Sequence, residues 1–279
     1  MGRSSGTLGG IMIALLALAV GSAHAFDVER AKKHIETMAA DEFEGRKSGL
    51  AGGVMIEEYV AARFEEFGLE PGGVDGTYYQ PFPMIVTDEK AASITLLDGT
   101  LGEVPFVPGE DFFMITNSGS GEIEAEVVIV GHGLAKPEWE WDDYQDIDLE
   151  GKIALIVRGR PDNGYDWARY ARRDSSMKQA VARGAVAVVW LPSSHPVNGA
   201  AISEGSYEPE VPCAYVAERV FRLLLRDTGH NVKSYKAALE KGPTPFATGK
   251  RLRFTADVER VADGSARNSI GLVRGTDPV

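Results

Sequence analysis

Two short apolar runs on either side of a helical pattern, between residues 141 and 191, constrain the fold of this chain more than any other feature. The runs are residues 153–157 and 185–191, and the helical pattern is residues 175–183, closed by Gly184. Continuous apolar residues are typical of strands buried on both faces of a parallel sheet, and a glycine commonly follows the last turn of a helix. The stretch therefore predicts a right-handed β-α-β unit, with the two runs as adjacent parallel strands and the helix packed on their sheet.

Short motifs accompany this unit. Asp-Tyr leads into Asp-Leu-Glu-Gly-Lys-Ile, Arg-Gly-Arg-Pro follows the first apolar run, and Gly-Ala ends the helix. The residues concerned are Asp143, Tyr144, Asp148, Gly151, Lys152, Arg158, Gly159, Pro161, Lys178, Ala182, Gly184 and Ala185. Together they resemble the protease-associated domain, which in the families that carry it is a non-catalytic insert, often a lid or substrate-side wall of a peptidase. The resemblance implies such a domain at residues 91–258; an unrelated α/β module is the alternative.

The N-terminal part of the chain is predicted to form a helical hairpin followed by an extended segment. Asp27 can cap a helix over residues 28–39, in which apolar residues recur at helical spacing. After a loop at residues 41–49, a second helix is expected over residues 51–67, where Gly68 suits the left-handed position that ends a helix. Aromatic, extended sequence follows from residue 78 to residue 86.

A second set of motifs lies in this hairpin. It comprises Asp-x-x-x-Gly-Arg-x-x-Gly, a helix end with Phe-Gly-Leu-x-Pro, and Tyr-x-Gln-x-Phe. The matching residues are Asp41, Gly45, Arg46, Gly49, Phe67, Gly68, Leu69, Pro71, Tyr78, Gln80 and Phe82. They resemble the start of bacterial zinc-dependent aminopeptidases, which belong to the glutamate carboxypeptidase and transferrin receptor-like group. The resemblance implies that residues 26–90 are the N-terminal lead-in of a phosphorylase/hydrolase-like α/β peptidase core; the alternative is an unrelated helical hairpin.

The tail, residues 259–279, resembles the point at which the core of these peptidases begins. Asn268-x-x-Gly271 and Gly275-x-x-Pro278 carry the likeness. In the family, such a segment leads into a strand that ends in a His-x-Asp metal motif, which we expect to lie beyond this chain. We therefore expect residues 268–273 to form a strand without its sheet neighbours. Between the lead-in and the tail, strands are also expected over residues 92–97, 213–216 and 252–258, and Ser234 can cap a short helix that ends at Leu239. The resulting fold class is α/β (α+β), a helical lead-in with an inserted β/α domain.

The first 25 residues have the pattern of a secretory signal peptide. Arg3 provides a basic start, residues 11–20 an apolar core, and Ala23-His24-Ala25 a cleavage site. The apolar core is too short to cross a bilayer comfortably, so we expect no membrane span after cleavage. The expected location is secreted or periplasmic, and N-terminal sequencing of the exported protein should begin at Phe26.

The composition of the chain limits which partners and which cysteine chemistry can be expected. A net charge of −12 and a pI near 5.0 argue against a nucleic-acid partner. Cys213 is the sole cysteine, so no intrachain disulfide can form. Because it lies between proline and an apolar tripeptide, we expect a buried strand residue and not a nucleophile.

The histidines do not have the spacing of a metal centre. A two-zinc site needs several histidine and carboxylate ligands, and the chain after the predicted signal peptide has only His34, His132, His195 and His230. His132 ends an apolar strand, but the residue two positions later is Leu134 and not aspartate, so a turn histidine is the preferred interpretation. We predict no catalytic residue and no metal ligand in this chain. The family resemblance implies zinc, as two ions, in the full-length enzyme.

Two charged clusters remain as candidates. Asp142, Asp143, Asp146 and Asp148 could bind calcium, but they lack the glycine and glutamate of an EF-hand loop, so hydrogen-bonded turns near Lys152 are preferred. The arginines of residues 158–173 could contact a substrate carboxylate, with Arg158 and Arg160 as the candidate substrate-binding residues; a solvated loop paired with nearby acids is the alternative.

These observations lead to one functional hypothesis and two rivals. The chain is interpreted as the N-terminal portion of an exported zinc metallo-aminopeptidase, whose protease-associated domain acts as a substrate lid or interaction module for a peptide substrate. As written, it should be inactive. The rivals are a stand-alone exported binding protein and a pseudoenzyme without catalysis. Substrate preference, oligomeric state and the role of the acidic cluster stay open.

Overall fold

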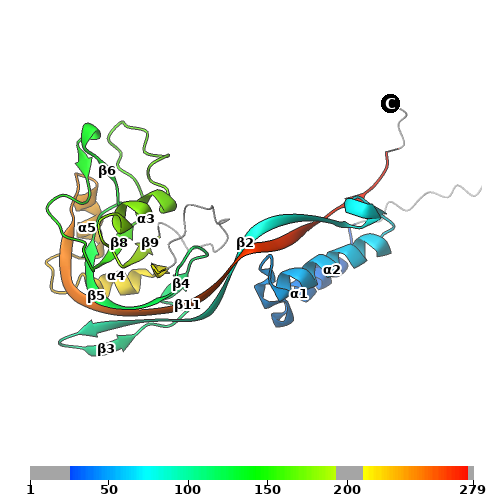
Figure 1. Cartoon of the computed structure of the whole chain (residues 1–279), viewed down its shortest axis with the longest axis horizontal. Coiled ribbons are helices and arrows are strands. Elements are labelled where there is room, and N and C mark those ends of the chain that lie inside the picture. Colours follow the sequence, from blue (N-terminus) through cyan, green and yellow to red (C-terminus); the bar gives the residue numbers. More distant parts are fainter. Residues whose placement is uncertain (1–25, 193–209, 276–279) are drawn as a thin grey trace, which may run out of the picture.

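The computed structural model of the chain describes residues 26–192 and 210–275, so the predicted signal peptide lies outside the described residues. Two long paired strands join two parts of the molecule (Figure 1). The head, residues 92–256, is built on an eight-stranded sheet, and the lead-in, residues 26–78, contains two main helices. The neck consists of the paired segments 79–91 and 257–269 between them. The fold is a mixed α+β fold, as the sequence predicts.

The predicted β-α-β unit lies at the centre of the head. β8 (Ile153–Val157) and β9 (Ala187–Leu191) are adjacent and parallel, as expected. α3 (Arg173–Val181) begins two residues earlier than the predicted helix, and its Met177 lies in one buried cluster with Val188 of β9. Every residue of the two strands is buried. Burial on both faces is the reason that their sequences are apolar throughout.

Helices cover both faces of this sheet. Leu155 of β8 belongs to the same buried cluster as residues of α4 (Glu218–Leu224) and α5 (Val232–Leu239), whereas Ile156 belongs to the cluster that contains α3. Successive residues of a strand point to opposite faces. The sheet therefore has two apolar cores, one against α4 and α5 and one against α3.

The sheet runs in the order β3-β2-β11-β5-β8-β9-β10-β4. Four central strands are parallel: β5 (Gly121–Ile129), β8, β9 and β10 (Cys213–Val216). The outer strands are antiparallel to their neighbours, and β3 (Gly102–Pro105) and β4 (Phe112–Met114) form the edges. The predicted strand at residues 213–216 is confirmed, and Cys213 is fully buried in it.

Two long strands run from the head into the neck. β2 (Tyr79–Asp98) joins the two extended segments that the sequence predicts on either side of residue 90, and β11 (Phe246–Ser269) extends well beyond the strand expected at residues 252–258. They pair antiparallel, with two register shifts. The expected domain boundaries near residues 90 and 259 fall inside these strands, and the division into domains stays a prediction.

The tail of the chain has sheet neighbours. Asn268 lies opposite Gln80 in the neck, and β12 (Gly271–Leu272) pairs antiparallel with β1 (Glu70–Pro71) of the lead-in. The expectation that residues 268–273 would lack neighbours is therefore wrong. The physical reason is that the lead-in and β2 supply the backbone partners that the tail strand needs.

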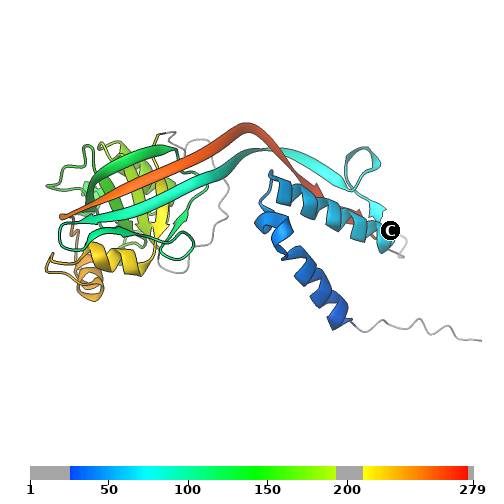
Figure 2. The same cartoon turned by 90° about the horizontal axis from the view of Figure 1, so that it is seen from below.

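The two helices of the lead-in are those predicted. The side chain of Asp27 caps α1 (Val28–Met38). After α2 (Ala51–Glu66), Gly68 has a φ of +72°, and the N–H of Leu69 donates back to a carbonyl of the last turn at 2.9 Å. This is the hydrogen-bond pattern of a glycine-terminated helix. α2 lies along the neck, whereas α1 diverges from it (Figure 2).

Short elements and one corrected cap complete the fold. α5 is capped by Asn231, whose side chain accepts the N–H of Ser234 at 2.9 Å; Ser234, the expected cap, is the third residue of the helix and returns the bond to Asn231. No helix among the described residues is long and apolar enough to span a membrane. The short elements are η1 (Asp41–Arg46), η2 (Val74–Gly76), β6 (Ala135–Lys136), η3 (Pro137–Trp139) and β7 (Trp141–Asp142).

Candidate functional site

The two arginines proposed as substrate contacts lie just after β8. The backbone N–H of Arg158 donates to the carbonyl of Leu191 at 2.8 Å, which fixes the chain at the end of the sheet. The Arg158 side chain is half-buried and that of Arg160 is exposed. Among the described residues, neither side chain has a hydrogen bond or an ion pair. Arg160 is thus exposed and Arg158 only partly so, and substrate contact stays a prediction for both.

His132 lies in the turn after β5, as the preferred interpretation expects. Its backbone N–H donates to Asp143 Oδ2 at 2.9 Å, and its Nδ1 lies 2.9 Å from the carbonyl oxygen of Val157. Burial lowers the pKa of His132, and the hydrogen bond with the Val157 carbonyl raises it by a smaller amount. The Nδ1 of His34 lies 2.6 Å from the hydroxyl oxygen of Tyr59. Both residues belong to the lead-in, far along the chain from the His132 turn.

The histidines and acids of the described residues do not form a metal centre. No group of three or more histidine, cysteine, aspartate or glutamate side chains within residues 26–192 and 210–275 could hold a metal ion. His230 lies among aromatic rings, with its ring stacked on Phe246 at 5.2 Å, and His195 is outside the described residues. The described residues therefore do not fit the two-zinc site of the family resemblance, and we assign them no step through zinc.

The acidic cluster caps turns. Asp142 accepts the N–H of Tyr144, and Asp148 that of Glu150, each at 2.9 Å. Such contacts between an aspartate and the backbone two residues later are typical of tight turns. Lys152 forms its ion pair with Glu126, at 2.9 Å, and not with the acidic cluster as its sequence position suggested.

Asp143 differs from the other acids because it is fully buried. Its Oδ2 accepts the backbone N–H groups of His132 and Leu134 at 2.9 and 3.0 Å. Burial raises the pKa of Asp143 to about 7, and the two N–H groups oppose that shift. Asp143 therefore ties β7 to the turn after β5, and its protonation state changes near neutral pH.

A cleft of about 760 Å³ lies where the lead-in, the neck and the head meet. Residues 44–50 of the lead-in form one wall, residues 84–89 of β2 form another, and residues 114–116 at the end of β4 form the third. This volume is in the range of ligand-binding pockets. The cleft is the candidate functional site of the described residues, because it combines apolar side chains with both signs of charge.

The loop that forms the first wall has an unusual backbone. Glu44, Gly45 and Arg46 have φ values of +46°, +72° and +60°. Three consecutive left-handed residues are rare, and for side chains other than glycine this conformation is strained. The buried ring of Phe43 anchors the loop, and a Cβ on Gly52 would lie 2.0 Å from the Phe43 carbonyl oxygen, so only glycine fits at this position of α2.

Lys47 connects this loop to β2. Its Nζ donates to the carbonyl oxygen of Thr87. Burial lowers the pKa of Lys47, while the carboxyl groups of Asp88 and Glu89 oppose that change. Burial also raises the pKa of Glu89. The cleft therefore contains charged groups that are partly removed from water, and Lys47 joins two of its walls through the Thr87 carbonyl.

Sequence reasoning singled out the loop but not the cleft. Asp41, Gly45, Arg46 and Gly49 were part of the family resemblance and were given no role in binding. The three walls come from segments that are far apart in the chain, and no single motif contains them. The glycines were the available signal, because they mark a backbone that must take left-handed values.

Comparisons with known proteins support the fold. No protein-family model matches the chain, and no curated protein matches it. Among solved structures, the chain is similar to an aminopeptidase from Aneurinibacillus sp. strain AM-1, with 18% identity and a TM-score of 0.50 over 86% of this chain and 46% of that one. It is also similar to a peptidase M28 precursor from Shewanella amazonensis SB2B, with 16% identity and a TM-score of 0.50 over 86% of this chain and 52% of that one. The chain thus shares its fold with about half the length of each structure.

Proposed function

We propose that this chain is the N-terminal portion of an exported zinc metallo-aminopeptidase. The fold is the observation that carries the proposal, because 86% of the chain aligns with an aminopeptidase and, separately, with a peptidase precursor. The motifs of the lead-in and of the head support the same assignment. In this proposal, residues 1–25 are the signal peptide, 26–90 the lead-in, 91–258 the protease-associated domain, and 259–279 the start of the metallopeptidase core.

The head would then act as a substrate lid or as an interaction module for a peptide substrate. Arg158 and Arg160 support this role, because both follow β8 at one end of the sheet, where Arg160 is exposed and Arg158 half-buried. Zinc and the water that it activates would be held by residues beyond the described ones, since these do not fit a metal centre. The part played by this chain is therefore to bind and orient a peptide and not to cleave it.

Sequencing of the coding DNA beyond the codon for Val279 is the first test. We expect an open frame that encodes a His-x-Asp motif. The extended protein and the 279-residue chain should then be compared for zinc content after dialysis and for hydrolysis of a chromogenic amino-acid anilide. We expect zinc and turnover in the extended protein alone.

Three outcomes would contradict the proposal. Stoichiometric zinc with turnover in the 279-residue chain would mean that its own residues form the metal centre. A stop codon directly after Val279, with peptide binding but no turnover, would favour the stand-alone binding protein. An extended protein that keeps the fold but binds no zinc would favour the pseudoenzyme.

A further inference from the structure

We propose that the β8–α3 loop, residues 158–172, is a docking surface for acidic peptide segments, and that its arginines Arg158, Arg160 and Arg169 bind the peptide carboxylates. The inference rests on the proposed function for the source of the peptide, a substrate polypeptide, and it names the chemical class of that substrate. Three features of the molecule support it: the place of the loop in the fold, the aromatic contacts that hold the loop, and the charged groups that it presents.

The β8–α3 loop starts at the carboxyl end of a central parallel strand. β8 lies between β5 and β9 and is parallel to both. The turn that follows β5 is a close neighbour, because a Cβ on Gly159 would lie 2.8 Å from Cε1 of the His132 ring. Open α/β sheets commonly bind ligands just outside the carboxyl ends of their strands. The loop therefore begins at the edge of the sheet where a ligand is expected.

Aromatic side chains hold the loop in place. Trp167 is 1% exposed, and its Nε1 donates to Asn163 Oδ1 at 2.8 Å. The ring of Tyr165 stacks on that of Trp139 in η3, with centroids 4.9 Å apart and 5° between the planes. Tyr165 is nevertheless 46% exposed. The loop is thus ordered around an accessible aromatic ring before any ligand arrives, which lowers the entropic cost of binding.

The net charge of the loop is opposite in sign to that of the whole chain. The loop has four arginines and two aspartates, whereas the chain has a net charge of −12. Arg172 forms an ion pair with Asp174 at 3.3 Å. Within residues 26–192 and 210–275, no hydrogen bond or ion pair engages the other three arginine side chains, of which Arg160 and Arg169 are exposed and Arg158 is half-buried. These guanidinium groups can bind carboxylates through paired hydrogen bonds.

A short acidic peptide is the occupant that suits this surface. Arginine and tyrosine are enriched among the residues that dominate the binding energy of protein interfaces, and charge complementarity speeds association and selects the partner. Because the chain as a whole is acidic, repulsion disfavours contact of such a peptide with acidic surface elsewhere. A nucleic acid carries the same sign of charge, but its phosphate backbone would extend from the loop onto that acidic surface.

The probe is the peptide Asp-Glu-Leu-Glu-Asp-amide with an uncharged fluorescent label at its N-terminus, and fluorescence anisotropy measures its binding to the full chain. The matched control is Asn-Gln-Leu-Gln-Asn-amide, which has nearly the same shape and no carboxylate. We expect the acidic peptide to bind about tenfold or more tightly than the control, because hydrogen bonds to charged groups are the stronger ones. Added salt should weaken the binding of the acidic peptide, since salt screens exposed charges.

Arg160→Gln, Arg169→Gln and Arg222→Gln form the matched set of variants. Each removes one positive charge from an exposed arginine, so circular dichroism and Tm should show the parent fold. Arg222 is the control, because it lies on α4, where it pairs with Glu218 at 3.4 Å. We expect about a fivefold or greater loss of affinity for the acidic peptide in each loop variant, and parent-like affinity in Arg222→Gln.

Equal binding of the acidic peptide and its amide control, or equal affinities in all three variants, would overturn the docking surface. Tighter binding of a single-stranded oligothymidine than of the acidic peptide would assign the loop to nucleic acid and would overturn it as well. The anilide assay of the extended protein is independent, because an uncharged amino-acid anilide offers the loop no carboxylate. Turnover without acidic-peptide binding would refute this inference and leave the proposed function intact. Acidic-peptide binding with no zinc and no turnover in the extended protein would do the reverse.

Discussion

The head and the lead-in bury their apolar residues to very different extents. In the head, β8 and β9 are wholly buried between two layers of helices. In the lead-in, α1 has no buried residue, and Ile35 on it is 63% exposed. Of the large apolar side chains that are exposed in the described residues, three lie in the head: Leu101, Val107 and Tyr165. The others lie in the lead-in, the neck and the tail: Phe26, Val28, Ile35, Val54, Met55, Phe67, Val74, Phe82, Val261, Leu272 and Val273.

This difference indicates where the stability of the chain originates. Burial of apolar surface is the dominant favourable contribution to folding, and the head buries far more of it. The helices of the lead-in are defined by local features, namely the Asp27 cap and the Gly68 terminus, and by contact with the neck. We therefore expect the head to unfold as the more stable unit, and the lead-in to open at lower free energy.

The largest expected effect comes from a charge in the head. Val188→Asp would place a carboxyl group at a position of β9 with no exposure, on the face of the sheet that α3 covers. We expect a loss of several kcal/mol or failure to fold, because an unpaired buried carboxylate is strongly unfavourable. The matched change in the lead-in, Ile35→Asp, should cost less than about 1 kcal/mol, since surface substitutions have small effects. Thermal unfolding of both variants measures the difference.

Equal losses of unfolding free energy in these two variants would contradict the proposed difference in stability between the head and the lead-in. A stable Val188→Asp protein would mean that β9 is not a central strand. A strongly destabilised Ile35→Asp protein would mean that α1 is covered by another part of the chain or by a second molecule. Sedimentation of the Ile35→Asp variant separates these two causes, because only loss of a partner changes the mass of the particle.

Asp143 gives the head a pH dependence near neutral pH. Its pKa is raised from an ordinary 3.8 to about 7, so the folded state binds the proton more tightly than the unfolded state. The stabilisation is complete below about pH 4 and is lost as the pH rises through about 7. At ~1.4 kcal/mol for each pKa unit, the loss is ~4 kcal/mol. Asp143→Asn should remove this slope.

The measurement is denaturant unfolding between pH 4 and pH 8 for the parent and for Asp143→Asn. The free energies of unfolding should be similar at pH 4, and the asparagine variant should be the more stable one at pH 8. Asp142→Asn is the control, because it removes a neighbouring charge and leaves the buried carboxyl in place. If parent and Asp143→Asn follow parallel curves, the Asp143 carboxyl does not titrate in this range.

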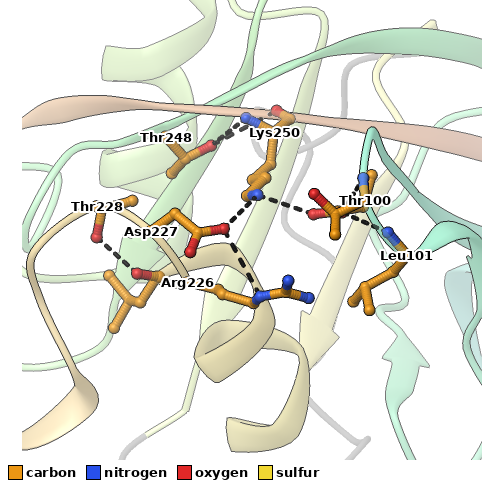
Figure 3. Close-up of polar contacts among 9 residues, drawn as sticks. Thr100, Leu101, Arg226, Asp227, Thr228, Thr248 and Lys250 are labelled. Atoms are coloured by element: carbon orange, nitrogen blue, oxygen red, sulfur yellow. Dashed lines mark hydrogen bonds and ion pairs between the residues drawn. The ribbon is translucent and has the colours of Figure 1, made fainter.

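A smaller effect is expected at the polar contact that holds the β2–β3 turn. Figure 3 shows the side chain of Lys250 between Asp227 and the turn at Thr100 and Leu101. Lys250 Nζ lies 2.8 Å from Asp98 Oδ2, and that carboxyl also accepts the two N–H groups of the turn. Lys250→Met should lower the Tm of the head by a few degrees, because Asp98 keeps its backbone partners.

The corresponding contact in the neck is the ion pair of Arg267 with Glu57, at 2.7 Å. Arg267→Met should leave the Tm of the head unchanged and should speed hydrogen exchange in α2, which Glu57 ties to β11. An equal fall in Tm for both variants would mean that the head and the lead-in unfold together.

The sequence predicted the elements that have local signals. Residues 153–157 and 213–216 are strands as expected, because short apolar runs between polar loops define them. The Asp27 cap and the Gly68 terminus likewise depend on neighbours in the chain. The β2 strand was expected as two pieces, because Asp88, Glu89 and Lys90 interrupt its apolar pattern. Those residues lie in the neck, where the strand has solvent beside it.

Long-range partners account for what the sequence did not predict. The pairing of the tail with Gln80 and with β1 joins the two ends of the described chain. The cleft is formed by three distant segments, and its glycines were visible only as part of a family pattern. Asn231 and Ser234 were both able to cap α5, and the choice depends on where the helix begins, which propensity does not fix to one residue.

The last expected effect is confined to the junction of the two regions. Gly264 of β11 faces Val86 of β2, and a Cβ on Gly264 would lie 2.5 Å from Val86 Cγ2. Gly264→Ala should therefore cost about 1–3 kcal/mol, the usual range for overpacking, and the cost should appear as opening of the neck and not of the head. Val86→Ala removes the clashing methyl group, so the double variant should be more stable than the sum of the two single losses predicts. Hydrogen exchange resolved along β2 measures this. Strictly additive losses would mean that Val86 does not fill the space beside Gly264, and that the neck is not the tight joint through which the lead-in is positioned against the head.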